Sequence, residues 1–88
     1  MLKISVTNQS NEGIEFQLEG KLVGRWVEEL RRLSDEAFAR QKAVTLDMRK
    51  LWFVDAHGIA LLRDLARKEV TQVNCSQFIS QQLKETAL

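Results

Sequence analysis

Proline is absent from this sequence of 88 residues, and cysteine and histidine each occur once. Without proline, low-complexity tracts or internal repeats, nothing marks a linker, so we expect residues 1–88 to form one small domain around one core. The single cysteine, Cys75, cannot form an internal disulfide. A reduced cytoplasmic setting is therefore expected, with a fold that depends on packing alone.

The sequence also lacks an excess of charge of either sign and a long apolar run. Its 13 basic and 12 acidic side chains give a formal net charge of +1, and their signs alternate along residues 24–42. This balance argues against a nucleic-acid partner, which needs lysine and arginine gathered on one face. No window approaches the roughly 20 apolar residues that span a membrane, and the N-terminus lacks a secretory apolar core. We expect neither nucleic-acid binding nor direct membrane insertion.

The inventory of reactive side chains is sparse. Asp55 and His57 are close in sequence, but no second histidine accompanies them, whereas zinc ligands occur in spaced clusters. Cys75 and His57 both lie near the ends of predicted strands, yet a free cysteine at a strand end usually behaves as a small buried hydrophobe. The four glycines are scattered and form no phosphate-binding loop. We expect no metal, no cofactor and no enzymatic activity.

Hydrophobic periodicity predicts an α/β fold. Period-two alternation indicates strands, and spacings of three and four indicate helices. The predicted strands cover 2–7, 14–20, 43–48 and 70–73, and the predicted helices cover 24–40, 56–69 and 76–88. The first two strands form an antiparallel hairpin, and the later alternation of strands and helices implies parallel crossovers. The prediction is a small mixed four-stranded sheet in the order β-β-α-β-α-β-α, with helices on one or both faces.

The same periodicities select the side chains expected in the core. The following are predicted to be buried: Ile4, Val6, Phe16, Leu18, Leu30, Leu33, Val44, Leu46, Leu62 and Leu83. The stripes of the predicted helices add Trp26, Ala37, Ile59, Ala66, Phe78 and Ile79. Ser76 is the predicted N-cap of the last helix.

The stretch LWFVDAHGIALLRDL, residues 51–65, places polar residues between an apolar run and a helical pattern. A carboxylate at Asp55 accepts hydrogen bonds from the first turn of the helix and faces the positive end of its dipole. Gly58 falls near the third helical position, where a missing side chain lets another backbone or a partner approach. His57 is predicted to be an exposed first-turn residue.

The sequence VTLDMRKLWFVDAHGIALLRDL resembles the central signature of the STAS domain, which is named for sulfate transporters and anti-sigma factor antagonists. Asp47 matches the first acidic position of that signature, Asp55 the second, and Gly58 its glycine. The flanking stretches FQLEGKLVGRWVEELRRL and VNCSQFISQQL resemble the second strand with the first helix and the last strand with the last helix. The resemblance implies a single STAS-like domain.

The resemblance also implies a function. In the family, a serine or threonine often follows the second aspartate, and a kinase that is also an anti-sigma factor phosphorylates it to end binding. Here the matching residue is Ala56, which has no hydroxyl group, and the next position is His57. The expectation is a partner-binding surface at Asp55, Ala56, His57 and Gly58, without a phosphorylation site.

Four functions stay open at this point, of which the last is a small enzyme that uses His57 and Cys75. The first is an anti-sigma factor antagonist-like regulator or scaffold that binds a kinase-like anti-sigma factor. The second is a STAS subunit that docks on the ATPase of a lipid or other ABC transporter. The third is a nucleotide- or ligand-binding sensor, although the sequence shows no phosphate-binding motif. The sequence indicates no oligomeric state.

Overall fold

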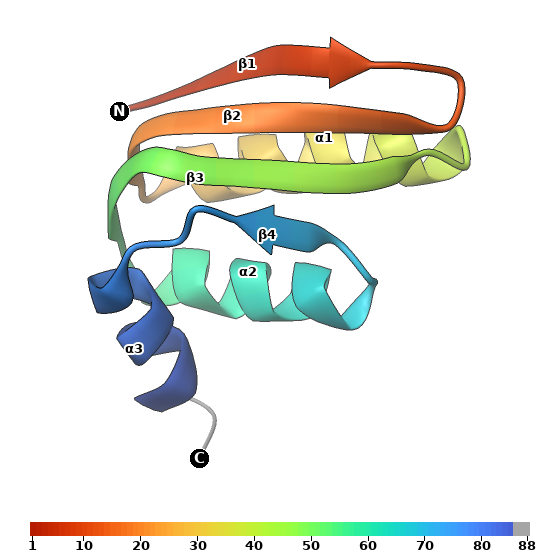
Figure 1. The fold of residues 1–88 in the computed structure, drawn as a ribbon. Coiled ribbons are helices and arrows are strands. Elements are labelled where there is room, and N and C mark those ends of the chain that lie inside the picture. Colours follow the sequence, from red (N-terminus) through yellow and green to blue (C-terminus); the bar gives the residue numbers. More distant parts are fainter. Residues whose placement is uncertain (86–88) are drawn as a thin grey trace.

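The computed structural model describes residues 1–85, which form a four-stranded sheet and three helices (Figure 1). Along the chain the elements are β1 (Leu2–Gln9), β2 (Gly13–Leu22), α1 (Arg25–Ala39), β3 (Ala43–Val54), α2 (Ala56–Arg67), β4 (Thr71–Val73) and α3 (Gln77–Glu85). The predicted order of elements is confirmed. Residues 86–88 of the last predicted helix lie outside the described residues.

The sheet follows the chain, with strands in the order β1-β2-β3-β4. β1 and β2 form the predicted antiparallel hairpin, whereas β3 runs parallel to both β2 and β4. A helix follows each of β2, β3 and β4. In such crossovers the helices begin where the parallel strands end, so the N-termini of the helices gather at one end of the sheet. We call this the helix-start end.

The helices α1 and α2 lie on the same side of the sheet (Figure 1). Strand side chains that face this side, such as Leu18 and Leu46, are completely buried. The opposite face is polar; there the Thr7 hydroxyl donates a 2.7 Å hydrogen bond to the Glu15 carboxylate. The sheet therefore has one apolar face under helices and one polar face, as expected for strands with alternating side chains.

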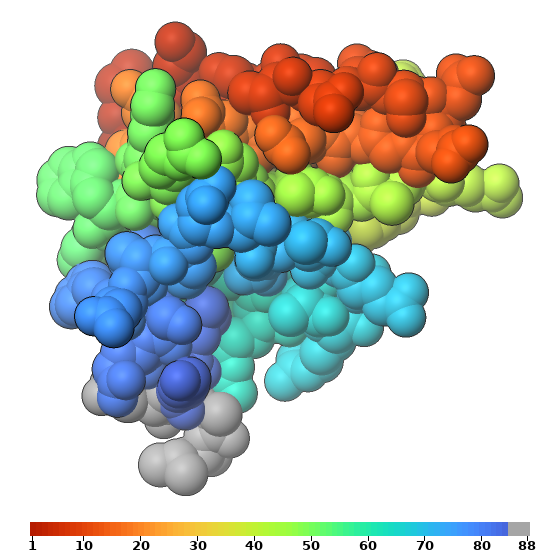
Figure 2. Space-filling model, viewed as in Figure 1, coloured from red at the N-terminus to blue at the C-terminus, as the bar shows by residue number. Residues whose placement is uncertain are grey.

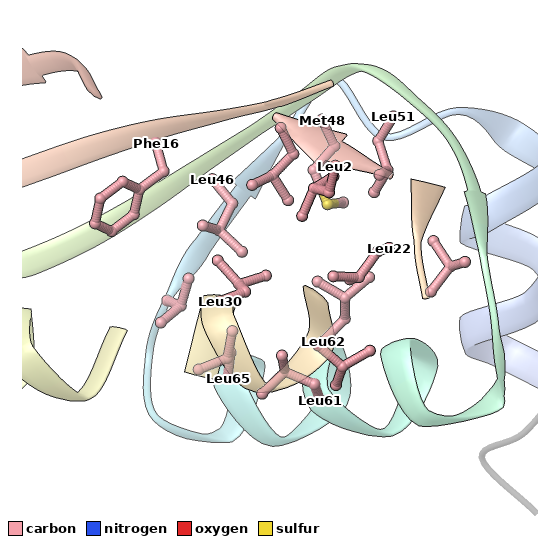
Figure 3. Close-up of a cluster of buried hydrophobic side chains, with 14 of the residues drawn as sticks. Leu2, Phe16, Leu22, Leu30, Leu46, Met48, Leu51, Leu61, Leu62 and Leu65 are labelled. Carbon is pink, nitrogen blue, oxygen red and sulfur yellow. The ribbon is translucent and has the colours of Figure 1, made fainter. Parts of the chain in front are cut away.

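The core fills the space between the sheet and the two longer helices. Leu30 of α1, Leu62 of α2 and Leu46 of β3 are each fully buried and converge there (Figure 3). The predicted core residues that are buried are Phe16, Leu18, Leu30, Val44, Leu46 and Leu62, together with Ala37, Ile59 and Ile79. Ile4, Trp26, Leu33 and Leu83 pack against this cluster while partly exposed. None of the helices formed by residues 1–85 is long and apolar enough to cross a membrane.

Three of the core predictions are wrong. Val6 is 54% exposed, because β1 is the edge strand and Val6 lines an open groove beside Leu33 of α1. Ala66 is exposed because the buried face of α2 ends at Leu65, and α3 lies beside the first turns of α2 rather than the last (Figure 1). Phe78 is 60% exposed, since its neighbour Ile79 is the residue that α3 turns inward.

Strand β3 is longer than predicted, reaching Val54 rather than residue 48. Its pairing with β2 contains two register shifts, and at each one β3 carries an extra residue. Leu51 and Val54 both face the core although they are three positions apart, because the second shift lies between them. A bulge interrupts the alternation of side chains, so residues 49–54 have no period-two signal in the sequence.

Candidate functional site

The turn from β3 to α2 is held by the side chain of Asp55. One carboxylate oxygen, Oδ1, accepts a 2.8 Å hydrogen bond from the backbone N–H of Gly58 in the first turn of α2. The other, Oδ2, accepts a 3.0 Å bond from the N–H of Gly24, directly before α1. The predicted N-cap is confirmed, and the same carboxylate also fixes the start of α1.

The charge of Asp55 is favoured by these bonds. Partial burial raises the pKa of this carboxyl, but the hydrogen bonds from the Gly58 and Gly24 N–H groups lower it further, so the net pKa lies below its ordinary value. Both helix N-termini also present the positive ends of their dipoles to this carboxylate. Asp55 is therefore an anion at neutral pH with both oxygens already occupied, which makes it a positioning group rather than a free base.

Gly58 brings the backbone of α2 close to β2 and to the end of β3. A Cβ atom built on it lies 2.5 Å from Val54 Cγ1 and 2.7 Å from the backbone oxygen of Leu22. The Leu22 oxygen accepts a 3.2 Å hydrogen bond from the N–H of Asp55. The predicted close approach of another backbone is confirmed, and it explains why a glycine occupies the third position of the helix.

The two residues between these anchors face solvent. Ala56 and His57 are both exposed, as predicted, whereas Gly58 is buried. The structure thus brings the four predicted site residues together in two roles. Asp55 and Gly58 fix the backbone, and Ala56 with His57 present a surface.

Two aromatic residues beside this turn were missed by the sequence analysis. Trp52 is 62% exposed and Phe53 is 40% exposed, at the end of β3 just before Asp55. The Lys21 Nζ lies 4.7 Å from the centroid of the Trp52 ring. The run Leu51–Val54 reads as core because all four residues are apolar. Adjacent residues of a strand point to opposite faces, and this was the available signal that some of them face outward.

Asp47, the first acidic position of the STAS-like signature, has a structural role. Its Oδ1 accepts hydrogen bonds from Asn74 Nδ2 at 2.9 Å and from the Arg49 N–H at 3.1 Å. The Asn74 bond is the main reason that the pKa of Asp47 is lowered. Because Asn74 follows β4 with a positive φ of 58°, this contact fixes the segment that leads to α3.

The start of α3 agrees with its sequence. Ser76 is the N-cap, since its Oγ accepts a 3.2 Å hydrogen bond from the N–H of Ile79. The adjacent Cys75 is partly buried against the core, and burial raises the pKa of its thiol. A catalytic cysteine needs the opposite shift. Among residues 1–85, no group of three or more His, Cys, Asp or Glu side chains is placed to hold a metal ion.

These elements, in this order and sheet topology, define the STAS-like fold that the sequence signature predicted. The chain matches no protein-family model and no curated protein. Among solved structures, it is similar to the anti-sigma factor antagonist SpoIIAA in its unphosphorylated form, with a TM-score of 0.76 and 19% identity. That match covers 93% of this chain and 82% of SpoIIAA.

A second solved structure shares the fold. It is an uncharacterized protein of the DUF3478 family from Shewanella loihica PV-4, described as having a SpoIIAA-like fold. The TM-score is 0.60 and the identity 18%, over 88% of this chain and 69% of that protein. The molecule therefore has the fold of an anti-sigma factor antagonist, with an exposed alanine–histidine pair at the start of its second helix.

Proposed function

We propose that this chain is a non-enzymatic protein-interaction module, an anti-sigma factor antagonist-like regulator or scaffold. It binds a partner protein through the Asp55–Gly58 turn and the first turn of α2. One observation carries the proposal: Ala56 and His57 stand exposed on a turn whose ends are fixed by the Asp55 hydrogen bonds and the buried Gly58. A surface fixed before binding loses little conformational entropy when a partner docks.

Binding at this turn is not switched by phosphorylation in our proposal. Ala56 stands where a hydroxyl residue would carry the phosphate, and an alanine side chain has no oxygen to accept one. A phosphate brings about −1.5 to −2 charges to such a surface. Without that switch, the domain is constitutively competent to bind. We place it in the bacterial cytoplasm as a single module of residues 1–88, without a cofactor.

A charge placed at the turn tests this proposal. Ala56→Glu adds an anion at the positive end of the α2 dipole, so the free domain should keep its melting temperature. In an interface, the same charge is desolvated without a dedicated partner, so binding should weaken markedly. The wild-type domain and the variant are each tagged and used to capture partners from lysate, and the captured protein is quantified by mass spectrometry.

Ala66→Glu is the matched control, because Ala66 is an exposed alanine on the same helix, in its last turn. The proposal expects Ala66→Glu to capture as much partner as the wild type and Ala56→Glu to capture far less. Equal capture by both variants would place the binding surface elsewhere. A captured kinase-like anti-sigma factor supports the regulatory role, whereas a captured transporter ATPase supports the alternative of a transporter subunit.

A further inference from the structure

The exposed aromatic residues beside the turn owe their position to the second bulge of β3. Leu51 pairs with Gly20 and Phe53 with Lys21, which leaves Trp52 as the extra residue. Such an insertion turns a side chain out of the regular alternation. Trp52 and Phe53 are thereby exposed to solvent near the end of β3, at the helix-start end of the sheet. Exposed aromatic side chains are enriched in protein interfaces.

Lysine side chains surround Trp52. Lys21 lies over its ring, and Lys3 and Lys50 line the same surface hollow as Trp52. None of these three lysines takes part in the salt bridges of residues 1–85, whose cations are Arg31 and Arg32 of α1 and Lys68 directly after α2. The one acidic residue that lines this hollow is Glu19, the cross-strand neighbour of Lys3 and Lys50, so the three lysines leave a net positive charge for a partner.

The backbone adds to this positive potential. The first turns of α1 and α2 both lie at the helix-start end, and each carries the positive end of a helix dipole. Of the acidic side chains there, Asp55 already accepts two backbone hydrogen bonds, and Glu28 lies in the first turn of α1. In the space-filling view, green atoms from the region where β3 ends and α2 begins project at one edge of the molecule (Figure 2). This region is thus open to a large ligand.

We infer that the lysine–aromatic surface, formed by Lys3, Lys21, Lys50 and Trp52, binds an acidic segment of the protein partner. Carboxylates of that segment meet the lysines, and an apolar side chain packs on the ring of Trp52. The inference rests on the proposed function, since Trp52 lies near the end of the strand that leads into the Asp55–Gly58 turn, and it adds the chemistry of the partner.

Glu19 favours a peptide over a nucleic acid or an anionic membrane. It lines the same hollow as Lys3 and Lys50 and divides the positive surface into separate points. A nucleic acid carries a charge on every phosphate and meets Glu19 wherever it lies. A peptide carries carboxylates only at particular positions, so it can pair with the lysines and leave Glu19 free or opposite a basic residue.

A randomised peptide library displayed on phage tests the inference without knowledge of the natural partner. The full chain is the bait, and selected peptides are then synthesised and titrated by fluorescence. The Trp26→Phe background makes Trp52 the only tryptophan, so its emission reports on this surface. The expected peptides combine Asp or Glu with apolar residues, change the emission of Trp52, and bind more weakly as salt rises.

Charge-reversal variants locate the binding. Lys21→Glu and Lys50→Glu should each weaken the selected peptides at least tenfold. The matched control is Lys42→Glu, because Lys42 precedes β3 at the opposite end of the strand. This variant should bind the selected peptides as tightly as the wild type does. A thermal melt of each variant confirms that the fold is intact.

The remaining outcomes separate this inference from the proposed function. Selected peptides without acidic residues, or acidic peptides unaffected by Lys21→Glu and Lys50→Glu, overturn the inference. If Ala56→Glu still weakens the binding of such peptides, the proposed function survives. If none of Ala56→Glu, Lys21→Glu and Lys50→Glu changes the affinity, the inference and the proposed function both fail. Tighter binding of single-stranded oligonucleotides or phosphatidylglycerol vesicles than of peptides, lost with the same lysines, would assign the surface to those polyanions instead.

Discussion

The two halves of β3 differ in regularity, and the surface that we propose to bind a partner includes residues of the irregular half. Residues 43–48 alternate strictly, so Val44, Leu46 and Met48 are buried against the helices. Residues 49–54 contain two extra residues relative to β2, and there Trp52 and Phe53 face solvent although both are apolar. Regular pairing commits apolar side chains to the core, whereas bulges release some of them to solvent. The first half gives its larger apolar side chains to the core alone, whereas the second half divides them between the core, at Leu51 and Val54, and solvent.

Truncation of a buried apolar residue in the first half should lower the free energy of unfolding, whereas truncation of an exposed one in the second half should not. Leu46 is completely buried, so Leu46→Ala should cost about 2–5 kcal/mol of unfolding free energy. Trp52 is larger but mostly exposed, and Trp52→Ala should change stability by about 0.5 kcal/mol or less. Urea unfolding of both variants measures this contrast. An equal loss in the two would mean that Trp52 belongs to the core.

A methyl group at Gly58 should be the next most damaging change. The new Cβ in Gly58→Ala meets the Leu22 backbone oxygen and the Val54 side chain, and overpacking of this kind costs about 1–3 kcal/mol. The helix gains up to about 1 kcal/mol of propensity, which offsets part of the loss. Ala60→Leu is the control, since it adds more atoms at an exposed position of α2. A thermal melt should show a lower melting temperature for Gly58→Ala alone.

Removal of the shared cap should have a smaller, pH-dependent effect. Asp55→Ala should cost about 0.5–2 kcal/mol, because α2 loses its N-cap. In a domain of this size, each kcal/mol lowers the melting temperature by about 4–8 °C. Since the folded pKa of Asp55 is depressed, its contribution is present above the ordinary pKa of an aspartate, about 4, and is lost as pH falls toward the folded value. The gap between wild type and variant should therefore narrow in acid.

Asp55→Asn separates the two helices that this carboxylate joins. Asparagine is as good an N-cap as aspartate, so its oxygen can keep the bond to Gly58. Its amide group has donors where Oδ2 accepted the bond from Gly24, so that second contact is lost. The expected melting temperature lies between those of wild type and Asp55→Ala. A value equal to that of Asp55→Ala would show that the bond to Gly24 matters more than the cap.

The smallest expected effect is the absence of a modification. Incubated with ATP and a cognate anti-sigma kinase, the wild-type domain should take no phosphate on residues 55–58. Ala56→Ser restores a hydroxyl at the same position and is the positive control for kinase recognition. Mass spectrometry under conditions that preserve acid-labile phosphate checks both proteins. Phosphate on His57 of the wild type would contradict a constitutively competent surface.

The sequence by itself determined the features that depend on neighbouring residues. Alternation in strands and spacing in helices were enough to predict the order of all seven elements. The cap at Asp55 and the cap at Ser76 were predictable too, because each carboxylate or hydroxyl bonds an N–H three residues ahead. Exposure of Ala56 and His57 follows from their place in the first turn of a capped helix. Local hydrogen bonds and periodicity act over a few residues, which a sequence shows directly.

Only the tertiary structure decided how distant segments meet. The second bond of Asp55 reaches Gly24, 31 residues away, and no local pattern in the sequence indicates it. The exposure of Val6 depends on β1 being the edge strand, and that of Trp52 on a bulge defined by the pairing of β3 with β2. An apolar residue is buried only where another element covers it. The sequence specified which side chains are apolar and therefore favoured in the core. The packing of strands and helices determined which of them remain exposed.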